Sequence, residues 1–314
     1  MFKPNQWQVL DLFCGAGGLS DGFNRMRFEI TGVDNSDLAG KTYELNTHHK
    51  FIRADLSKEF ISGGSYDVII GGPPCKPWSS INVTRRGKLH RDYPLLSRYF
   101  MQVEQYQPEI FILENVRPLA NDITLKRWIR KLKMRLGYSI ASSVIRYSDY
   151  GASTRRGRLI VVGMLHGNAK RFFQELEKSK SQPATVKHAI WTLRNKDKGE
   201  VPDHIWPELK TIDKYRKYYE TGKFGWYILK WNESAPSFGN IMKTYILHPD
   251  AFNGKPTRVI SVKEALLIMG YSKEFHFPEE AGIGARYQMV VDSVSPVFSR
   301  LLARVSSTML NAGG

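Results

Sequence analysis

The first half of the chain alternates short apolar runs with longer segments in which apolar residues recur every three or four positions. The short runs, rich in Val, Ile and Leu, are typical of buried strands. We expect strands at residues 7–13, 28–33, 68–70, 110–113, 139–146 and 159–164. The segments between them predict helices at residues 18–26, 36–46, 94–106 and 123–136. Such alternation is typical of an α/β fold, a doubly wound parallel sheet whose ligands bind at the carboxyl ends of the strands.

The alternation stops after about residue 167. Residues 167–257 hold four of the seven Trp, together with many Tyr and Lys, and predict a second, irregular domain. A helical pattern returns at residues 261–270, and residues 292–310 predict a closing helix. We therefore expect residues 1–180 and 287–314 to form the first domain, and residues 181–286 to form a smaller second domain inserted into it.

Composition adds a strong positive charge to this picture. The 314 residues include 46 Lys and Arg against 30 Asp and Glu, a formal net charge of +16. A folded cationic protein attracts polyanions, so nucleic acid is the first expected partner and an anionic membrane surface the second. With only two cysteines, the chain is neither a disulfide-rich scaffold nor a cysteine-rich zinc module, and we predict no metal site. It shows neither a signal peptide nor an 18-residue apolar run, so we expect a cytoplasmic protein without a membrane partner.

A glycine-rich segment follows the first predicted strand. Glycines at a strand-to-helix turn let the backbone approach a ligand, although they also mark ordinary corners. Asp34 ends the second strand about 20 residues later, where a carboxylate can bind a ribose diol. Asp55 follows a third apolar run and could accept a hydrogen bond from an adenine amino group, or could equally cap a helix. Together these residues predict a nucleoside-binding site.

Cys75 is the candidate nucleophile. It follows Gly-Gly-Pro-Pro at the end of a predicted strand, where a cysteine that merely fills the core would be out of place. Glu114 ends the next strand and could bind a ring nitrogen, or could be a solvated strand end. Arg156 and Arg158 precede another strand, where they could equally form a solvated charge cluster. The joint occurrence of these features favours a catalytic site.

At this point the sequence resembles the cytosine-5 DNA methyltransferases of bacterial restriction-modification systems. The resemblance covers nearly the whole chain, with its motifs in the family order. They are DLFCGAGG (11–18), GGPPC (71–75), ENV (114–116), Arg-x-Arg (156–158), RVISVKEAL (258–266) and DSVSP (292–296).

The resemblance implies a Rossmann-like S-adenosylmethionine-dependent methyltransferase sheet and an irregular target-recognition domain. Cys75 would attack C6 of a flipped-out cytosine, Glu114 would hold the N3 and N4 edge, and Arg158 would contact O2, with Arg156 beside it. Extrusion of the base costs a few kcal/mol. S-adenosylmethionine would be bound by Phe13, Cys14, Gly15, Ala16, Gly17, Gly18, Leu19, Asp34, Asn35, Asp55, Leu56, Gly72, Pro73, Asp292, Ser293 and Val294. Double-stranded DNA would be bound by Lys76, Ser79, Ser80, Arg85, Arg86 and Ser237.

The sequence departs from the family pattern in three places. The residues after the nucleophile are Lys76-Pro77-Trp78-Ser79, where the family usually has Gln and then an aromatic residue or Gly before Ser. Ser153 and Thr154 stand where Pro and Gln are common. Val291-Asp292 replaces a Gly-Asn pair whose asparagine lines the cofactor pocket.

Three functions follow as hypotheses. The first is a DNA methyltransferase, expected to be a monomer and to work beside a cognate restriction endonuclease. The second is an RNA methyltransferase of the tRNA branch, whose Cys-Phe-Thr signature is missing because residues 167–257 contain no cysteine. The third is a catalytically idle DNA-binding protein, against which the retention of Cys75, Glu114 and Arg158 argues.

Two basic segments receive different predictions. The loop at residues 79–96 should close over the flipped base, although a plain solvated loop has the same composition. The basic residues of the helix at 123–136 should lie on its solvated face, away from DNA, because Leu125, Ile129, Leu132 and Leu136 mark an apolar face.

Overall fold

The chain divides into two compact units. The structure, a computed structural model, describes residues 7–79, 87–208, 212–222, 225–254 and 256–312. The first unit comprises the chain up to Ile145, Gly157–Lys180 and the chain from Phe298 onward, and the second comprises Arg146–Arg156 and Ser181–Val297. The division differs from the expected one at residues 146–156 and 287–297, which pack with the second unit.

A mixed sheet forms the centre of the first unit. Within the described residues its seven strands lie in the order β3-β2-β1-β4-β5-β7-β6. They are β1 (Gln8–Leu12), β2 (Glu29–Asp34), β3 (Lys50–Arg53), β4 (Val68–Gly71), β5 (Ile110–Asn115), β6 (Ser139–Arg146) and β7 (Gly157–Met164). The first five are parallel neighbours, and β7 runs antiparallel to β5. The α/β fold is therefore confirmed, although the sheet is mixed rather than purely parallel.

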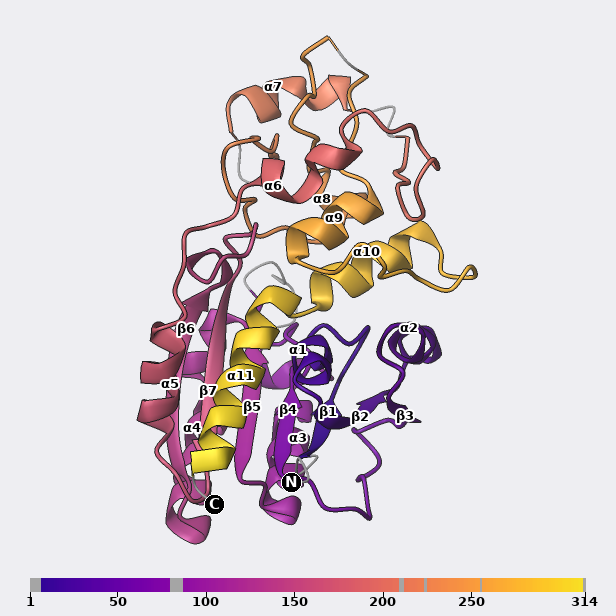
Figure 1. The fold of residues 1–314 in the computed structure, drawn as a ribbon. Coiled ribbons are helices and arrows are strands. Elements are labelled where there is room, and N and C mark those ends of the chain that lie inside the picture. The colour runs from indigo at the N-terminus through magenta and orange to yellow at the C-terminus, as the bar shows by residue number, and fades with distance from the viewer. Residues whose placement is uncertain (1–6, 80–86, 209–211, 223–224, 255, 313–314) are drawn as a thin grey trace, which may run out of the picture. The chain divides into compact units, whose positions relative to one another are not determined.

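Helices cover both faces of this sheet. They are α1 (Ser20–Arg25), α2 (Asp37–Thr47), α3 (Leu95–Tyr106), α4 (Ile123–Leu136), α5 (Ala169–Glu177) and α11 (Pro296–Ala312). Figure 1 shows α11 crossing the strands on one face, while α3 and α4 lie on the other. The sequence did not predict α5, because its amphipathic pattern lies within the segment where the composition changes.

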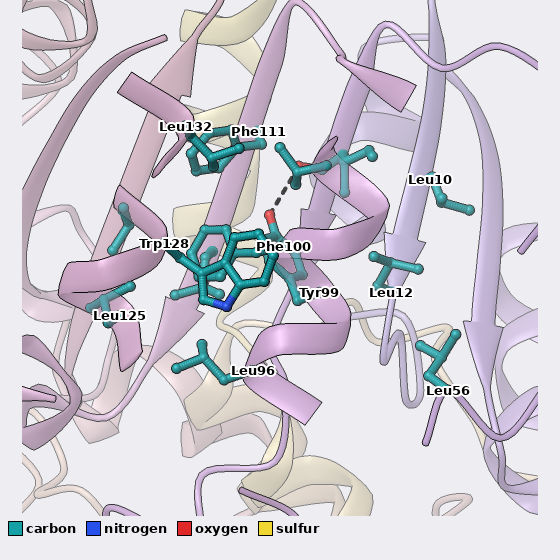
Figure 2. Packing of buried hydrophobic residues seen from close by; sticks show 14 of the residues in the cluster. Leu10, Leu12, Leu56, Leu96, Tyr99, Phe100, Phe111, Leu125, Trp128 and Leu132 are labelled. Carbon is teal, nitrogen blue, oxygen red and sulfur yellow. Dashed lines mark hydrogen bonds between the residues drawn. The ribbon is translucent and has the colours of Figure 1, made fainter. Parts of the chain in front are cut away.

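The core between the sheet and α3 and α4 is densely aromatic. Phe100 of α3 stacks on Trp128 of α4, with ring centroids 5.7 Å apart, and Phe111 of β5 meets Phe100 edge-on. Figure 2 shows these rings facing the strands, and the hydroxyl group of Tyr99 donates a hydrogen bond to the carbonyl oxygen of Ile69. Burial of such side chains is worth roughly 1.5–3 kcal/mol each. This packing holds the ends of β4 and β5 in a fixed register.

The closing helix joins the far end of the chain to α1. Gly22 of α1 donates its N–H to Ser299 Oγ of α11 at 3.1 Å, and Ser299 Oγ in turn donates to the carbonyl oxygen of Leu19. A Cβ at Gly22 would lie 2.2 Å from the Ser299 carbonyl carbon, so only glycine permits this approach. The predicted start of this helix at residue 292 is wrong. An extended link at Ser293 separates α10 from α11, which begins at Pro296.

The second unit has short helices joined by long irregular segments. They are α6 (Val186–Ile190), α7 (Arg216–Glu220), α8 (Ile241–Thr244), α9 (Val262–Met269) and α10 (Ile283–Asp292). Ser261 and Glu264 form a reciprocal capping box at the start of α9. Glu264 also accepts two hydrogen bonds from Arg258, at 2.7 and 2.8 Å. Burial alone would raise the pKa of this carboxyl, but the hydrogen bonds and the charge of Arg258 outweigh it, so the pKa is lowered. Polar pairs of this kind hold the irregular chain where regular structure is sparse.

Candidate active site

The strand register brings the predicted functional segments to one edge of the sheet. Leu12 of β1 lies opposite Val33 of β2 and Gly71 of β4, and Gly71 lies opposite Leu113 of β5. Because these strands are parallel, the chain leaves all of them at the same edge. The glycine-rich loop, Asp34, the Pro-Pro-Cys loop and Glu114 therefore share that edge.

The glycine-rich loop bends sharply after β1. Phe13 adopts a left-handed φ of 61°, which is uncommon for a non-glycine residue, and Gly15 and Gly17 have φ values of 52° and 85°. Gly15 donates its N–H to Asp34 Oδ2 at 3.0 Å, so the loop is held against the end of β2. No heavy atom lies within 4 Å of the Cβ position at Gly15, which leaves its outer side open to a ligand.

A buried polar cluster supports the loop from below. Ser20 Oγ donates to Asp11 Oδ2 at 2.6 Å and lies 3.1 Å from the hydroxyl oxygen of Tyr43. Asp11 is only 1% exposed, and burial raises its pKa to about 7. Burial likewise raises the pKa of the Cys14 thiol well above its usual range, so Cys14 is unsuited to act as a nucleophile.

Asp34 and Asp55 both present carboxylates near this edge. Asp34 Oδ1 accepts from the N–H of Ser36 at 3.0 Å, and each carboxylate oxygen can accept a further hydrogen bond. Asp55 Oδ1 accepts from both the N–H and the hydroxyl group of Ser57, and these hydrogen bonds lower the pKa of Asp55. The helix that Asp55 could have capped is absent, since residues 56–67 form turns, bends and irregular chain.

The other predicted cofactor residues fall into two groups. In the first unit, Ala16, Gly17, Gly18 and Leu19 are buried in the loop before α1, Leu56 and Pro73 are buried in the segments that follow β3 and β4, and Asn35 is exposed. Asp292, Ser293 and Val294 belong to the second unit. There the Asp292 carboxylate is exposed and accepts a hydrogen bond from Gln288 at 2.8 Å.

The Pro-Pro-Cys loop is fixed on both sides of Cys75. The amide group of Asn115, at the end of β5, donates to the carbonyl oxygen of Pro73 at 2.8 Å. After Cys75 the chain turns, because the N–H groups of Trp78 and Ser79 both donate to the Cys75 carbonyl oxygen at 3.0 Å. Cys75 is partly exposed, whereas Cys14 is buried. Of the two cysteines, Cys75 is thus the accessible one.

Glu114 and Arg158 form an ion pair beside this loop. Arg158 Nε lies 3.0 Å from Glu114 Oε1, and their side chains are 12% and 10% exposed, respectively. The antiparallel pairing of β5 and β7 sets Asn115 opposite Leu159, so Arg158 at the start of β7 reaches the end of β5. A Cβ at Gly72 would lie 3.3 Å from Glu114 Oε2, which places this carboxylate directly beside the chain leading to Cys75.

Arg156 has a different environment. Its Nη2 atom donates to the carbonyl oxygen of Val291 in α10 at 2.6 Å, within the second unit, and its side chain is buried.

The role of Asn115 in holding Pro73 was not predicted from the sequence, which indicated only its place in the motif. The signal that could have indicated it is a polar residue at the end of a strand that is otherwise apolar and fully buried.

The predicted DNA-binding residues are described only in part. Lys76 and Ser237 are exposed and Ser79 is half-buried, while Ser80, Arg85 and Arg86 lie outside the described residues, as does much of the loop at 79–96. On α4, Leu125, Trp128 and Leu132 are the buried residues. Lys131 differs from its basic neighbours on this helix, because it is half-buried and its Nζ lies 2.6 Å from Glu104 Oε2.

The described residues contain neither a cluster of metal ligands nor a membrane-spanning helix. Among those residues, no three His, Cys, Asp or Glu side chains are grouped to hold a metal ion. None of the helices in the same ranges combines the length and apolar composition that a bilayer span requires.

Comparison with known proteins agrees with this geometry. A model of the C-5 cytosine-specific DNA methylase family matches residues 7–306. Type II methyltransferase M.HgiDI of Herpetosiphon aurantiacus is 28% identical over 303 residues, covering 92% of this chain and 90% of that protein. M.FnuDI of Fusobacterium nucleatum, also a type II methyltransferase, is 27% identical over 343 residues, covering 96% and 95%. The solved structure of Schizosaccharomyces pombe Dnmt2 methyltransferase shares the fold, with a TM-score of 0.69 and 14% identity over 96% of this chain and 98% of that one.

Proposed function

The chain belongs to the C-5 cytosine-specific DNA methylase family, and we propose that it transfers the methyl group of S-adenosylmethionine to C5 of a cytosine flipped out of a specific duplex sequence. The observation that carries this proposal is the Glu114–Arg158 ion pair beside the Cys75 loop. A nucleophile in the loop after β4, a carboxylate on β5 and a guanidinium group on β7 match the three contacts that a cytosine ring requires.

The cofactor segment fits the expected nucleoside. Open space beside Gly15 and the constrained turn at Phe13 leave room for the methionine portion next to backbone N–H groups. Asp34 retains acceptor capacity for the ribose hydroxyl groups, and Asp55 supports an adenine contact. When bound, S-adenosylmethionine supplies an electrophilic methyl group.

The reaction assigned to this chain begins with the Cys75 thiolate. Its sulfur adds to C6 of the cytosine, which makes C5 nucleophilic and able to accept the methyl group. Glu114 binds the N3 and N4 edge, and Arg158 both orients Glu114 and contacts O2. Loss of the C5 proton and expulsion of the Cys75 sulfur then restore the aromatic ring.

DNA binding follows from the net charge of +16 and from the second unit. Residues 181–257, all within the second unit, carry 12 Lys and Arg against 8 Asp and Glu and include exposed Ser237. We assign target recognition to this region. We also propose that the cytosine is flipped out of the duplex, because Cys75 cannot reach C6 while the base is stacked. We assign Arg156 the role of anchoring α10 through Val291, a contact within the second unit.

We further propose that the protein is the modification enzyme of a restriction-modification system, acting as a monomer in the cytoplasm beside a cognate endonuclease. Relatives named as type II methyltransferases along almost the whole chain support this assignment. Resistance of host DNA to an endonuclease encoded beside the gene, and sedimentation as a 36.0 kDa species, are the corresponding tests.

The decisive experiment is bisulfite sequencing of DNA from a host that expresses the protein. Wild type should protect cytosines at one recurrent sequence, and Cys75→Ala should protect none. In parallel, a 5-fluorocytosine duplex with cofactor should trap a covalent adduct at Cys75, with buried Cys14 as the internal control. Methylation of RNA alone would support the RNA methyltransferase. Specific DNA binding without adduct or methylation would identify an idle homologue.

A further inference from the structure

Asp122 joins three segments around the nucleophile. It lies between β5 and α4, and its Oδ2 atom accepts from Trp78 Nε1 at 2.8 Å and from the hydroxyl group of Tyr93 at 3.0 Å. Its Oδ1 atom accepts from the N–H groups of Thr124 and Leu125 at 2.7 and 3.3 Å and thereby caps α4. One carboxylate thus serves a helix cap and two aromatic side chains that are distant in sequence.

The Trp78 side of its contact with Asp122 is buried, and Asp122 itself is half-buried. Trp78 is 8% exposed, and its ring centroid lies 5.4 Å from that of Tyr93. An indole N–H in such a position needs an acceptor, and a charged acceptor makes a shorter and stronger hydrogen bond than a neutral one. A helix cap alone does not require this arrangement, since Asn or Ser caps a helix as well as Asp.

Trp78 is coupled directly to Cys75. Its backbone N–H donates to the Cys75 carbonyl oxygen, and Pro77, between them, accepts from the N–H of Gly87 at 2.8 Å. The Trp78 ring therefore determines how the turn after the nucleophile is seated, just as Asn115 fixes Pro73 before it. We propose that Asp122 is a positioning residue for the methyl-transfer reaction. It acts through the Trp78 indole to hold the Cys75 sulfur in its attacking direction.

The inference rests on the proposed function, and the main test is Asp122→Asn. Asparagine keeps one oxygen for the helix cap but replaces the other with an N–H₂ group, which cannot accept from Trp78. We expect kcat and the rate of adduct formation with a 5-fluorocytosine duplex to fall about tenfold or more. The KM values for DNA and S-adenosylmethionine should stay within about twofold, because Asp122 contacts neither.

A second pair of variants separates positioning from stability. Trp78→Phe keeps an aromatic side chain, although a smaller one, and removes the N–H donor, so Asp122→Asn should have little further effect on kcat in that background. Asn168→Ala removes the side chain that caps α5, far from Cys75 in the sequence. It should lower the thermal midpoint at least as much as Asp122→Asn does while leaving kcat unchanged.

Two results would overturn the inference. One is a wild-type kcat in Asp122→Asn. The other is independent, multiplying losses in Asp122→Asn and Trp78→Phe, which would mean that Asp122 does not act through the indole. If Asp122→Asn does not fold, the kcat values of Trp78→Phe and Tyr93→Phe replace it as the test. A fall of about tenfold in Trp78→Phe would support the inference, and wild-type kcat values in both variants would overturn it. Failure of the proposed function is distinguishable, because wild type itself would then neither methylate DNA nor form the adduct.

Discussion

The buried carboxyl group of Asp11 should make the stability of the first unit depend on pH. Burial raises its pKa from an ordinary value of 3.8 to about 7, and hydrogen bonds with Ser20 offset this shift only in part. The folded state therefore binds a proton more tightly than the unfolded state does. Stability from this group is fully present below about pH 4 and is lost progressively as the pH rises to about 7.

The magnitude follows from the difference between the two pKa values. They differ by about 3 pH units, and each unit corresponds to roughly 1.4 kcal/mol, so the total loss is about 4 kcal/mol. Asp11→Asn removes the titration while keeping an oxygen that can accept from Ser20. This variant should gain stability relative to wild type between pH 5 and pH 8.

Urea unfolding at pH 5, 6, 7 and 8 measures the effect, with the free energy of unfolding extrapolated at each pH. Other titrating groups cancel in the difference between variant and wild type. Asp37→Asn, which removes a carboxylate at an exposed position of α2, is the control for the change in net charge. Parallel curves for Asp11→Asn and wild type would show that Asp11 ionises normally in the folded protein and would refute this reasoning.

Three further predictions concern the fold, the cofactor and the DNA. Gly22→Ala should destabilise the protein by about 1–3 kcal/mol through overpacking against Ser299, whereas Gly284→Ala, whose Cβ position meets no atom closer than 4.0 Å, should be neutral or slightly stabilising in thermal melts. Asp34→Asn should weaken S-adenosylmethionine binding at least about tenfold by calorimetry, and an unchanged Kd would remove Asp34 from the ribose site. Changing Arg130 and Lys133 of α4 to Gln should cost less than about tenfold in specific DNA affinity near 150 mM salt, or roughly 1.4 kcal/mol, and a larger loss would place this helix at the DNA.

The strand ends were predictable because their signals are local. Apolar runs define β1, β4 and β5, and the residues directly after them are those that parallel pairing gathers at one edge. Arg158 could be placed only through the family motif, since nothing local shows that β7 runs antiparallel to β5. That reversal is what brings Arg158 to Glu114.

Contacts between distant residues were beyond sequence reasoning. Trp78 and Asp122 are 44 residues apart, and neither carries a pattern that indicates the other. The start of α11 was misplaced because residues 283–312 are apolar at helical spacing throughout, and only Pro296 signals the break. Proline fits the first turn of a helix, whereas the residue before it avoids helical backbone.

The bonds of Ser299 to α1 also bear on how the protein is made. A ribosome synthesises the chain from the N-terminus, so α1 emerges almost 280 residues before Ser299 of α11, to which it is hydrogen-bonded. Until then the glycine-containing face of α1 is uncovered, and the first unit cannot complete its core during synthesis. The glycine-rich loop immediately before α1 should therefore gain its final rigidity only after α11 has left the ribosome.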